Sequence, residues 1–362
     1  MLNSLRRKVF FLNKSIKCFY LILVLLFCGV VFGFWQYSQQ SEQLSIVPIV
    51  SRAILASKEP IEPIPLHLEL NKSKVKLGEK LFHDSRLSGD NTISCASCHN
   101  LNTGGTDRLV HSIGIKKQLH FMNLVNSPTV FNSGFNFKQF WNGRAETLED
   151  QVESPLLSEH QMAGNNWSEV VNKLKQFSEY VSWFKQLYSN GITSNNIDNN
   201  IDNIKDAIAT FERSLYTPNS RFDRFLRGER NALTEEEKEG YQRFKSYGCV
   251  SCHQGMLLGG NMFQSFGLHG NYFADRGNVT KADLGRFNVT GDERDRYVFK
   301  VPSLRNVVLT NPYFHDGSAA TLEEAIKVMA KYQLGRQLPQ TDIALIIKFL
   351  NTLTGEYEGK PL

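Results

Sequence analysis

Apolar residues recur every three or four positions along several stretches of the chain, a spacing that places them on one face of an α-helix. This pattern predicts helices over 72–84, 169–184, 204–215, 235–246, 322–329 and 342–353. Two of these helices begin with a capping-box signature, Thr234 with Glu237 and Thr321 with Glu324. No strand-like alternation of any length appears. The sequence therefore predicts a mostly α-helical chain.

Other stretches lack an apolar face. Residues 100–140 and 254–300 show no helical period, and they are predicted to be rich in loops. Residues 189–203 hold six asparagines and are predicted to form a surface loop. The helix over 169–184 is predicted to be capped by Ser168. Its single apolar stripe consists of Val170, Leu174, Phe177, Val181 and Phe184.

The most apolar segment lies near the N-terminus. Residues 18–35 contain no charge, and at 1.5 Å per residue they would span about 27 Å, close to the thickness of a bilayer core. A cleaved signal peptide usually has a shorter apolar run that ends in small residues, whereas this one ends in Phe34 and Trp35. We therefore predict a cytoplasmic leader and retained inner-membrane anchor over 1–37. A tether over 38–66 would then carry the rest of the chain in the periplasm.

The charge distribution supports this orientation and excludes one class of function. The formal net charge is +5, and five basic residues precede the first acid, Glu42. The rest of the chain is therefore balanced in charge, which argues against a nucleic-acid-binding protein because such a protein needs a basic surface. At 362 residues and 41% hydrophobic, the chain is long enough for more than one folded core.

Four of the six cysteines form two copies of one motif. The copies are Cys95-Ala96-Ser97-Cys98-His99 and Cys249-Val250-Ser251-Cys252-His253. The C-x-x-C-H spacing suits two thioether bonds to a c-type haem, with the histidine as an axial ligand of the iron. A zinc site would need further ligands near each pair, and a redox dithiol does not require the histidine. Two covalently bound c-type haems are therefore predicted.

The two motifs lie 154 residues apart, so each is predicted to have its own domain. We expect an N-terminal haem domain over 67–228 and a C-terminal haem domain over 229–362. The predicted fold class is thus mostly α, with two cytochrome c-like haem domains after an N-terminal transmembrane segment.

Several long segments resemble the bacterial di-haem cytochrome c peroxidases. They are LGEKLFHDSRLSGDNTISCASCHNL, NSPTVFNSGFNFKQFWNGRAETLEDQ, FERSLYTPNSRFDRFLRGE, GRFNVTGDERDRYVFKVPSLRNV and NPYFHDGSAATLEEA. The resemblance runs from about residue 72 to 357. It implies that a C-terminal haem receives electrons from a small cytochrome c or copper protein. These electrons pass to an N-terminal haem that reduces hydrogen peroxide to water.

The resemblance also implies the axial ligands. His99 and His253 would be the proximal ligands, and Met329 matches the methionine that the family places on the C-terminal iron. Met256 and Met262 are the other methionines after His253. His/Met ligation raises the potential of a haem, as an electron entry point requires. Related haem enzymes that mature a tryptophan-derived quinone have tyrosine at the position of Met329.

On the distal side of the N-terminal haem, the chain departs from the family twice. Some members have a distal histidine after a Ser-Ile-Gly step, but Ser112-Ile113-Gly114 is followed here by Ile115. An apolar residue there would leave the iron open to peroxide. Where the family has a catalytic Glu before a Met, this chain has Gln161. Gln can hydrogen-bond peroxide but cannot shuttle a proton, so we expect Gln161 to limit turnover.

Three further features follow from the same resemblance. Gln151 matches a second polar residue of the distal pocket, and Trp141 matches a tryptophan that lies between the two haems. A Ca²⁺ site between the domains would use the side chain of Asn126 and the backbone carbonyls of Thr310 and Pro312, a set of oxygen ligands that suits this ion.

Three functions from different classes remain open. The first is a membrane-tethered periplasmic peroxidase, the second is a di-haem electron-transfer protein with little turnover, and the third is a haem oxidase of a protein or organic substrate. Gln161 makes the second function credible and Met329 makes the third less favoured, so we rank the three functions in the order given. The electron donor and the oligomeric state, including a homodimer, stay open.

Overall fold

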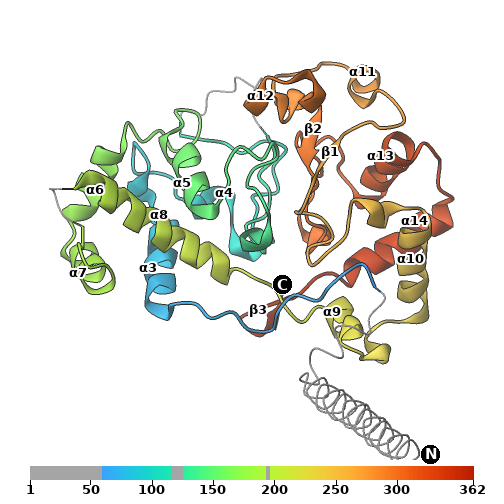
Figure 1. Cartoon of the computed structure of the whole chain (residues 1–362), viewed down its shortest axis with the longest axis horizontal. Coiled ribbons are helices and arrows are strands. Elements are labelled where there is room, and N and C mark those ends of the chain that lie inside the picture. The colour runs from blue at the N-terminus through green and yellow to red at the C-terminus, as the bar shows by residue number, and fades with distance from the viewer. Residues whose placement is uncertain (1–58, 116–124, 193–195) are drawn as a thin grey trace, which may run out of the picture. The chain divides into compact units, whose positions relative to one another are not determined.

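A computed structural model describes residues 59–115, 125–192 and 196–362 of the chain (Figure 1). Residues 59–362 group as one compact unit. The predicted membrane anchor lies outside the described residues. Among the helices of the described part, none is long and apolar enough to cross a membrane.

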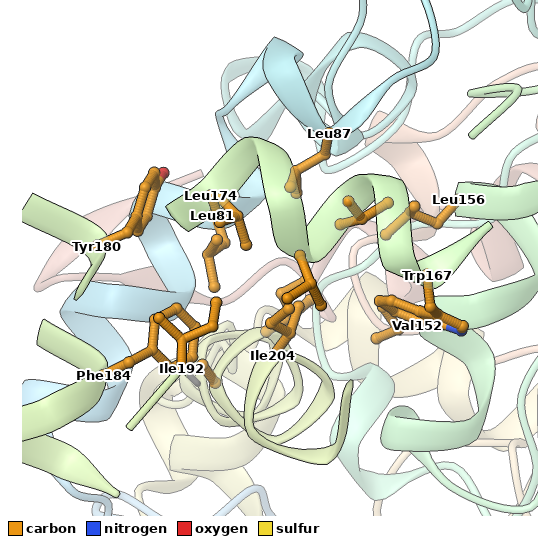
Figure 2. Close-up of a cluster of buried hydrophobic side chains, with 14 of the residues drawn as sticks. Leu81, Leu87, Val152, Leu156, Trp167, Leu174, Tyr180, Phe184, Ile192 and Ile204 are labelled. Carbon is orange, nitrogen blue, oxygen red and sulfur yellow. The ribbon is translucent and has the colours of Figure 1, made fainter. Parts of the chain in front are cut away.

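The first haem motif is surrounded by helices that pack on one central helix. Helix α8 (Ile197–Ser214) contacts α3 (Lys72–Phe82), α5 (Leu148–Leu157) and α6 (Trp167–Lys175). Helix α7 (Ser178–Leu187) packs on α3 and α6, and the single turn α4 (Cys95–Cys98) carries the motif. Figure 2 shows the shared core, in which Leu81, Leu174 and Ile204 are among the buried side chains. This core holds α5 and α8 in fixed positions beside the motif.

The second motif follows helix α10 (Glu235–Ser246), which packs along α14 (Gln340–Asn351). The predicted capping boxes are both formed: the Thr234 hydroxyl accepts from the Glu237 N–H, and the Thr321 hydroxyl accepts from the Glu324 N–H at the start of α13 (Leu322–Leu334). We call the part of the folded unit up to the end of α8 its first half and the part after α8 its second half. The remaining helices of the second half are α9 (Arg221–Leu226), α11 (Tyr272–Arg276) and α12 (Phe287–Thr290).

Strands are few and short in the described part. The pair β1 (Phe263–Ser265) and β2 (Val298–Lys300) is antiparallel, with Phe263 opposite Lys300, and β3 (Glu356–Tyr357) pairs with β4 (Lys360–Pro361). Runs of two or three residues cannot show an alternation in the sequence. Short 3-10 helices occur at Ser85–Leu87, Leu101–Thr103, Ser133–Phe135, Arg230–Ala232, Cys249–Ser251, Ala282–Leu284, Glu293–Asp295 and Val307–Leu309. The mostly helical fold is confirmed.

Three predictions of local structure were wrong. The single helix over 169–184 is two helices, because the backbone of Phe177 is extended and turns the chain between α6 and α7; Asn166, not Ser168, caps α6. The predicted loop over 189–203 ends at Asn196, whose side chain accepts from the Asn199 N–H and starts α8. Asparagine favours this cap position, so a cluster of asparagines marked a helix start as well as a loop.

The end of the predicted tether is part of the folded unit. Ile61 and Ile64 are fully buried, and the Ile64 N–H donates to Asp223 Oδ1 at 3.1 Å. The guanidinium of Arg305 donates to the Glu62 carbonyl at 3.1 Å and pairs with Asp223 at 2.9 Å. This segment can bury its isoleucines because Asp223 accepts a hydrogen bond from its backbone N–H and Arg305 donates one to its backbone carbonyl.

Candidate functional site

Each histidine of the two motifs is held by a hydrogen bond that leaves one ring nitrogen available. His99 Nδ1 lies 3.3 Å from the Gly105 carbonyl, and His253 Nδ1 lies 2.9 Å from the Leu258 carbonyl. A carbonyl only accepts, so Nδ1 carries the proton and Nε2 keeps its lone pair. This arrangement orients a metal-binding histidine.

The cysteines are arranged in the same way in both motifs. The one-turn helix α4 brings Cys95 and Cys98 one turn apart, and the His99 N–H donates to the Cys95 carbonyl at 3.0 Å. In the second motif the His253 N–H donates to the Cys249 carbonyl, also at 3.0 Å. All four thiols are free of disulfides. Each motif therefore presents two thiols and one imidazole to the same neighbourhood, as thioether attachment of a haem requires.

A large cavity of about 1240 Å³ lies beside the first motif. Its wall includes Cys95, Cys98 and His99 from the motif and Phe299 and Lys300 from β2. Most of the wall is apolar, as is usual for a cofactor site. The cavity is thus built by segments from both halves of the folded unit.

Basic side chains on this wall fit the carboxylates of a haem. Lys300 is only 8% exposed, and within the described residues its ammonium has no hydrogen bond or ion pair. Burial lowers the pKa of Lys300 to about 8. Arg144, on the same wall, is exposed and donates to Asn142 Oδ1 and Ser154 Oγ, and it has no acid partner among the described residues. A buried cation such as Lys300 is costly without an acid partner, and the propionates of a haem would supply the missing negative charge. The residues present therefore fit a haem in this cavity.

The structure brings the predicted distal residues together. Gln151 on α5 and Gln161 in the following loop both line the cavity. The Ile115 N–H donates to the Gln161 carbonyl at 3.0 Å, so the segment that lacks the family histidine lies beside the segment that lacks the family acid. This approach needs glycine at 114, since a Cβ there would lie 2.0 Å from the His160 carbonyl oxygen. His111 is half-buried and also lines the cavity.

Sequence analysis missed Glu212 on the cavity wall, as it also missed Arg144 and Lys300. Glu212 lies on α8, is 6% exposed, and accepts from Gln151 Nε2 on both carboxylate oxygens, at 2.9 and 2.8 Å. Burial raises the pKa of Glu212 to about 8; Glu149 adds to the rise, while Gln151 and Arg213 oppose it. A signal was present, because Glu212 follows Ile208 by four positions and so lies on the apolar face of its helix.

Trp141 links the two halves of the folded unit. Its indole Nε1 donates to the Asn126 carbonyl at 2.8 Å, and its own carbonyl accepts from the Lys300 N–H at 2.8 Å. Its ring meets the ring of His315 edge-on, with 6.5 Å between the ring centres. The Asn126 N–H in turn donates to the His315 carbonyl. Trp141 is therefore fixed in position and orientation at the border between the halves.

The predicted calcium ligands have different surroundings. Asn126 is buried, and its amide nitrogen donates to the Leu109 carbonyl, which directs the amide oxygen to the other side. Thr310 is half-buried and Pro312 is buried. Calcium binding by these three residues stays a prediction.

A separate cluster, Asp283, His315 and Asp316, has the composition of a metal site among the described residues. Arg276 pairs with both carboxylates, and His315 Nε2 lies 2.7 Å from Asp283 Oδ1. These contacts hold the pKa of the Asp283 carboxyl well below its usual range. The guanidinium already supplies the positive charge, so this cluster is an ion-pair network rather than a metal site.

Met329 lies half-buried on α13, which packs on α14. Helix α14 also contacts α10, the helix that leads into the second motif. Met329 and His253 thus belong to the same packed set of helices, and iron ligation by Met329 stays a prediction.

Comparison with known proteins identifies the family. Residues 72–231 match the family model described as di-haem cytochrome c peroxidase. The chain is 43% identical over 307 residues to the cytochrome c551 peroxidase of Nitrosomonas europaea, covering 84% of this chain and 87% of that protein. The chain belongs to the di-haem cytochrome c peroxidase family. The resemblance seen in the sequence is confirmed.

Further relatives agree with this membership. The chain is 48% identical over 299 residues to the cytochrome c peroxidase Ccp of Escherichia coli K12, covering 83% of this chain and 62% of that protein. It thus spans less than two thirds of this relative's length. Among solved structures, a MauG-like protein associated with microbial copper homeostasis has a TM-score of 0.69 and 31% identity, covering 82% of this chain and 93% of that one. As a member of the family, the chain is a two-haem protein.

Proposed function

We propose that this chain reduces hydrogen peroxide to water with electrons from a small cytochrome c or cupredoxin. The reaction is H2O2 + 2 e⁻ + 2 H⁺ → 2 H2O. The observation that carries the proposal is the cavity beside His99, because one wall combines the haem-attachment motif with Gln151, Gln161 and Glu212. These are polar groups able to bind peroxide and to handle protons.

In this proposal each group on the cavity wall has one task. Cys95 and Cys98 would attach the haem, His99 would bind its iron through Nε2, and Lys300 with Arg144 would neutralise its carboxylates. A bound haem supplies the redox chemistry at iron. Gln151 and Gln161 orient peroxide by hydrogen bonds, and the apolar wall keeps bulk water out.

The electrons would enter through the C-terminal haem, attached to Cys249 and Cys252 and bound by His253 and Met329. Trp141 would lie on the route between the haems, supported by its fixed contacts with Asn126 and Lys300. A Ca²⁺ bound by Asn126, Thr310 and Pro312 would brace the same border. The domain division at 228/229 belongs to this proposal.

The proposed location is the periplasm, with the chain tethered to the inner membrane through residues 1–37. The uncharged run over 18–35 and its basic flank support this orientation. Recovery of the full-length chain from washed membranes, and its release as a soluble protein when 1–37 are deleted, would test the anchor. Release of the full-length chain by a salt wash would contradict it.

Removal of the first motif's thiols tests the function. We expect Cys95→Ala/Cys98→Ala to lose one of two covalent haems by intact mass and to lose peroxide consumption with reduced cytochrome c. Cys28→Ala, a change in the leader, is the control and should keep both. An intact two-haem protein that accepts electrons but consumes no peroxide would instead favour the electron-transfer protein, which Gln161 in place of an acid makes the second candidate.

The ligand of the C-terminal iron is tested by potentiometry. We expect Met329→Ala to lower the reduction potential of that haem, because a thioether ligand favours the reduced state. Met262→Ala serves as the matched control and should leave the potential unchanged. The reverse result would assign the ligand to Met262, and no change in either variant would direct attention to Met256.

A further inference from the structure

We propose that Glu212 is the proton donor of the peroxide cavity and takes the role that a carboxylate at position 161 would have. This inference rests on the proposed peroxidase function. It concerns one of the two protons that each peroxide molecule needs, and it assigns that proton to a residue on α8 rather than to the loop after α5.

The first observation is the composition of the cavity wall. Among the described residues that line the cavity, Glu212 has the one carboxyl group. Gln151 and Gln161 are amides, which do not titrate near neutral pH. His99 is assigned to the haem, and Arg144 and Lys300 are cations that have no acid partner in the part of the chain that the structure describes. His111 and His160 are the remaining imidazole groups on the wall.

The second observation is how Glu212 is held. Gln151 Nε2 donates to both of its oxygens, at 2.9 and 2.8 Å, so the carboxyl group has a fixed orientation beside a residue of the predicted distal pocket. Gln151 comes from α5 and Glu212 from α8, two helices that pack directly on each other. The packing of the core thus fixes the position of the carboxyl group.

The charges around Glu212 are nearly balanced. Arg213, its neighbour on α8, pairs with Glu149 on α5 at 2.7 Å, so the cation is largely neutralised by a second acid. Cys95 on α4 also interacts electrostatically with Glu212, but a thioether bond to a haem removes this thiol from titration. Among the described residues, no lysine or arginine of α3, α5 or α6 forms an ion pair with Glu212. Burial is therefore the main cause of the raised pKa of Glu212.

Burial raises the pKa of Glu212 to about 8, which keeps the group protonated at neutral pH and still able to lose its proton. In the proposed step the carboxylic O–H bond breaks as an O–H bond forms on an oxygen in the cavity. The carboxylate that remains is stabilised by Gln151 and regains a proton from water. Over one cycle Glu212 is unchanged, and the donor protein supplies both electrons.

The alternative is that Glu212 only positions Gln151. Glu212→Gln separates the two roles, because an amide keeps a similar shape and can still accept from Gln151 but carries no transferable proton. Glu153→Gln is the matched control. Glu153 lies on α5, is ion-paired with Lys205 at 2.7 Å and does not line the cavity.

The experiment uses the full-length two-haem protein and measures the rate of peroxide-driven haem oxidation from pH 5 to 10. We expect the wild-type rate to fall as the pH rises through the pKa of Glu212, because the protonated form is the donor. Glu212→Gln should lower the rate by about 10²-fold or more and abolish this pH dependence. Glu153→Gln should match the wild type, and Glu212→Asp should retain a pH-dependent rate. An unchanged pH profile in Glu212→Gln would overturn the proposal and assign the proton to His111 or His160.

A second measurement does not depend on turnover. Infrared spectra of the wild type, recorded as a function of pH, should contain a protonated-carboxyl band that is lost on titration and is absent from Glu212→Gln. If the band is present but the wild type consumes no peroxide, the proposed function fails while Glu212 still holds a proton. If peroxide is consumed but the band is absent from both proteins, the assignment to Glu212 fails alone.

Discussion

Replacing Asp223 with alanine should lower the free energy of unfolding by about 3–5 kcal/mol, because it leaves a buried guanidinium without its counter-ion. Arg305 and Asp223 are both 0% exposed and lie 2.9 Å apart. Asp223 also accepts from the Ile64 N–H at 3.1 Å, and Arg305 donates to the carbonyls of Glu62 and Met256. One ion pair thus joins the segment that enters the folded unit to α9 and to the loop after β2.

Denaturant unfolding of the two-haem protein measures this change. The control is Asp292→Ala, since Asp292 pairs with Arg294 at 2.6 Å on the surface, where Arg294 is 90% exposed. Pairs of this kind contribute at most about 1 kcal/mol. A loss below about 1 kcal/mol in Asp223→Ala would show that water or a rearranged carbonyl compensates the guanidinium, and would contradict the structural role assigned to the pair.

The parts of the fold that were predictable depend on neighbours in the sequence. The Thr234 and Thr321 caps need only a residue three positions away, and both were placed correctly. The two haem motifs are equally local, since five consecutive residues bring the thiols and the imidazole together. The break at Phe177 was not predictable, because an apolar stripe continues across it while the backbone changes direction.

The parts of the site that were not predictable depend on contacts between distant segments. Glu212 acquires its properties from Gln151, 61 positions earlier, and from the burial that α5 and α8 create together. Lys300 becomes a cavity residue because β2 carries it beside Trp141. A sequence pattern shows that an acid lies on an apolar helix face, but it does not show which residue faces it. For this reason the sequence showed that position 161 lacks the acid of the family, but it did not show that Glu212 places a carboxyl group in the same cavity.

Gln161→Glu should restore peroxide cleavage in a Glu212→Gln background by roughly 10²-fold, because it returns a transferable proton to the cavity. Gln161 lines the same cavity, and its backbone is held by Ile115 and Ser158 through hydrogen bonds that the substitution does not touch. In the wild-type background the gain should be far smaller, since Glu212 already supplies a proton. Gln161 is thus expected to limit turnover only when Glu212 cannot donate a proton.

The measurement is the single-turnover rate of haem oxidation by peroxide in the four proteins of the cycle: the wild type, both single variants and the double variant. Gln186→Glu in the Glu212→Gln background is the control, because it adds the same carboxyl group on an exposed position of α7 and should restore nothing. Strong coupling between positions 161 and 212 would mean that either carboxyl group can serve one proton-transfer step. Equal acceleration by Gln161→Glu in both backgrounds would contradict this: the two groups would then act independently, and the original expectation for Gln161 would hold without reference to Glu212.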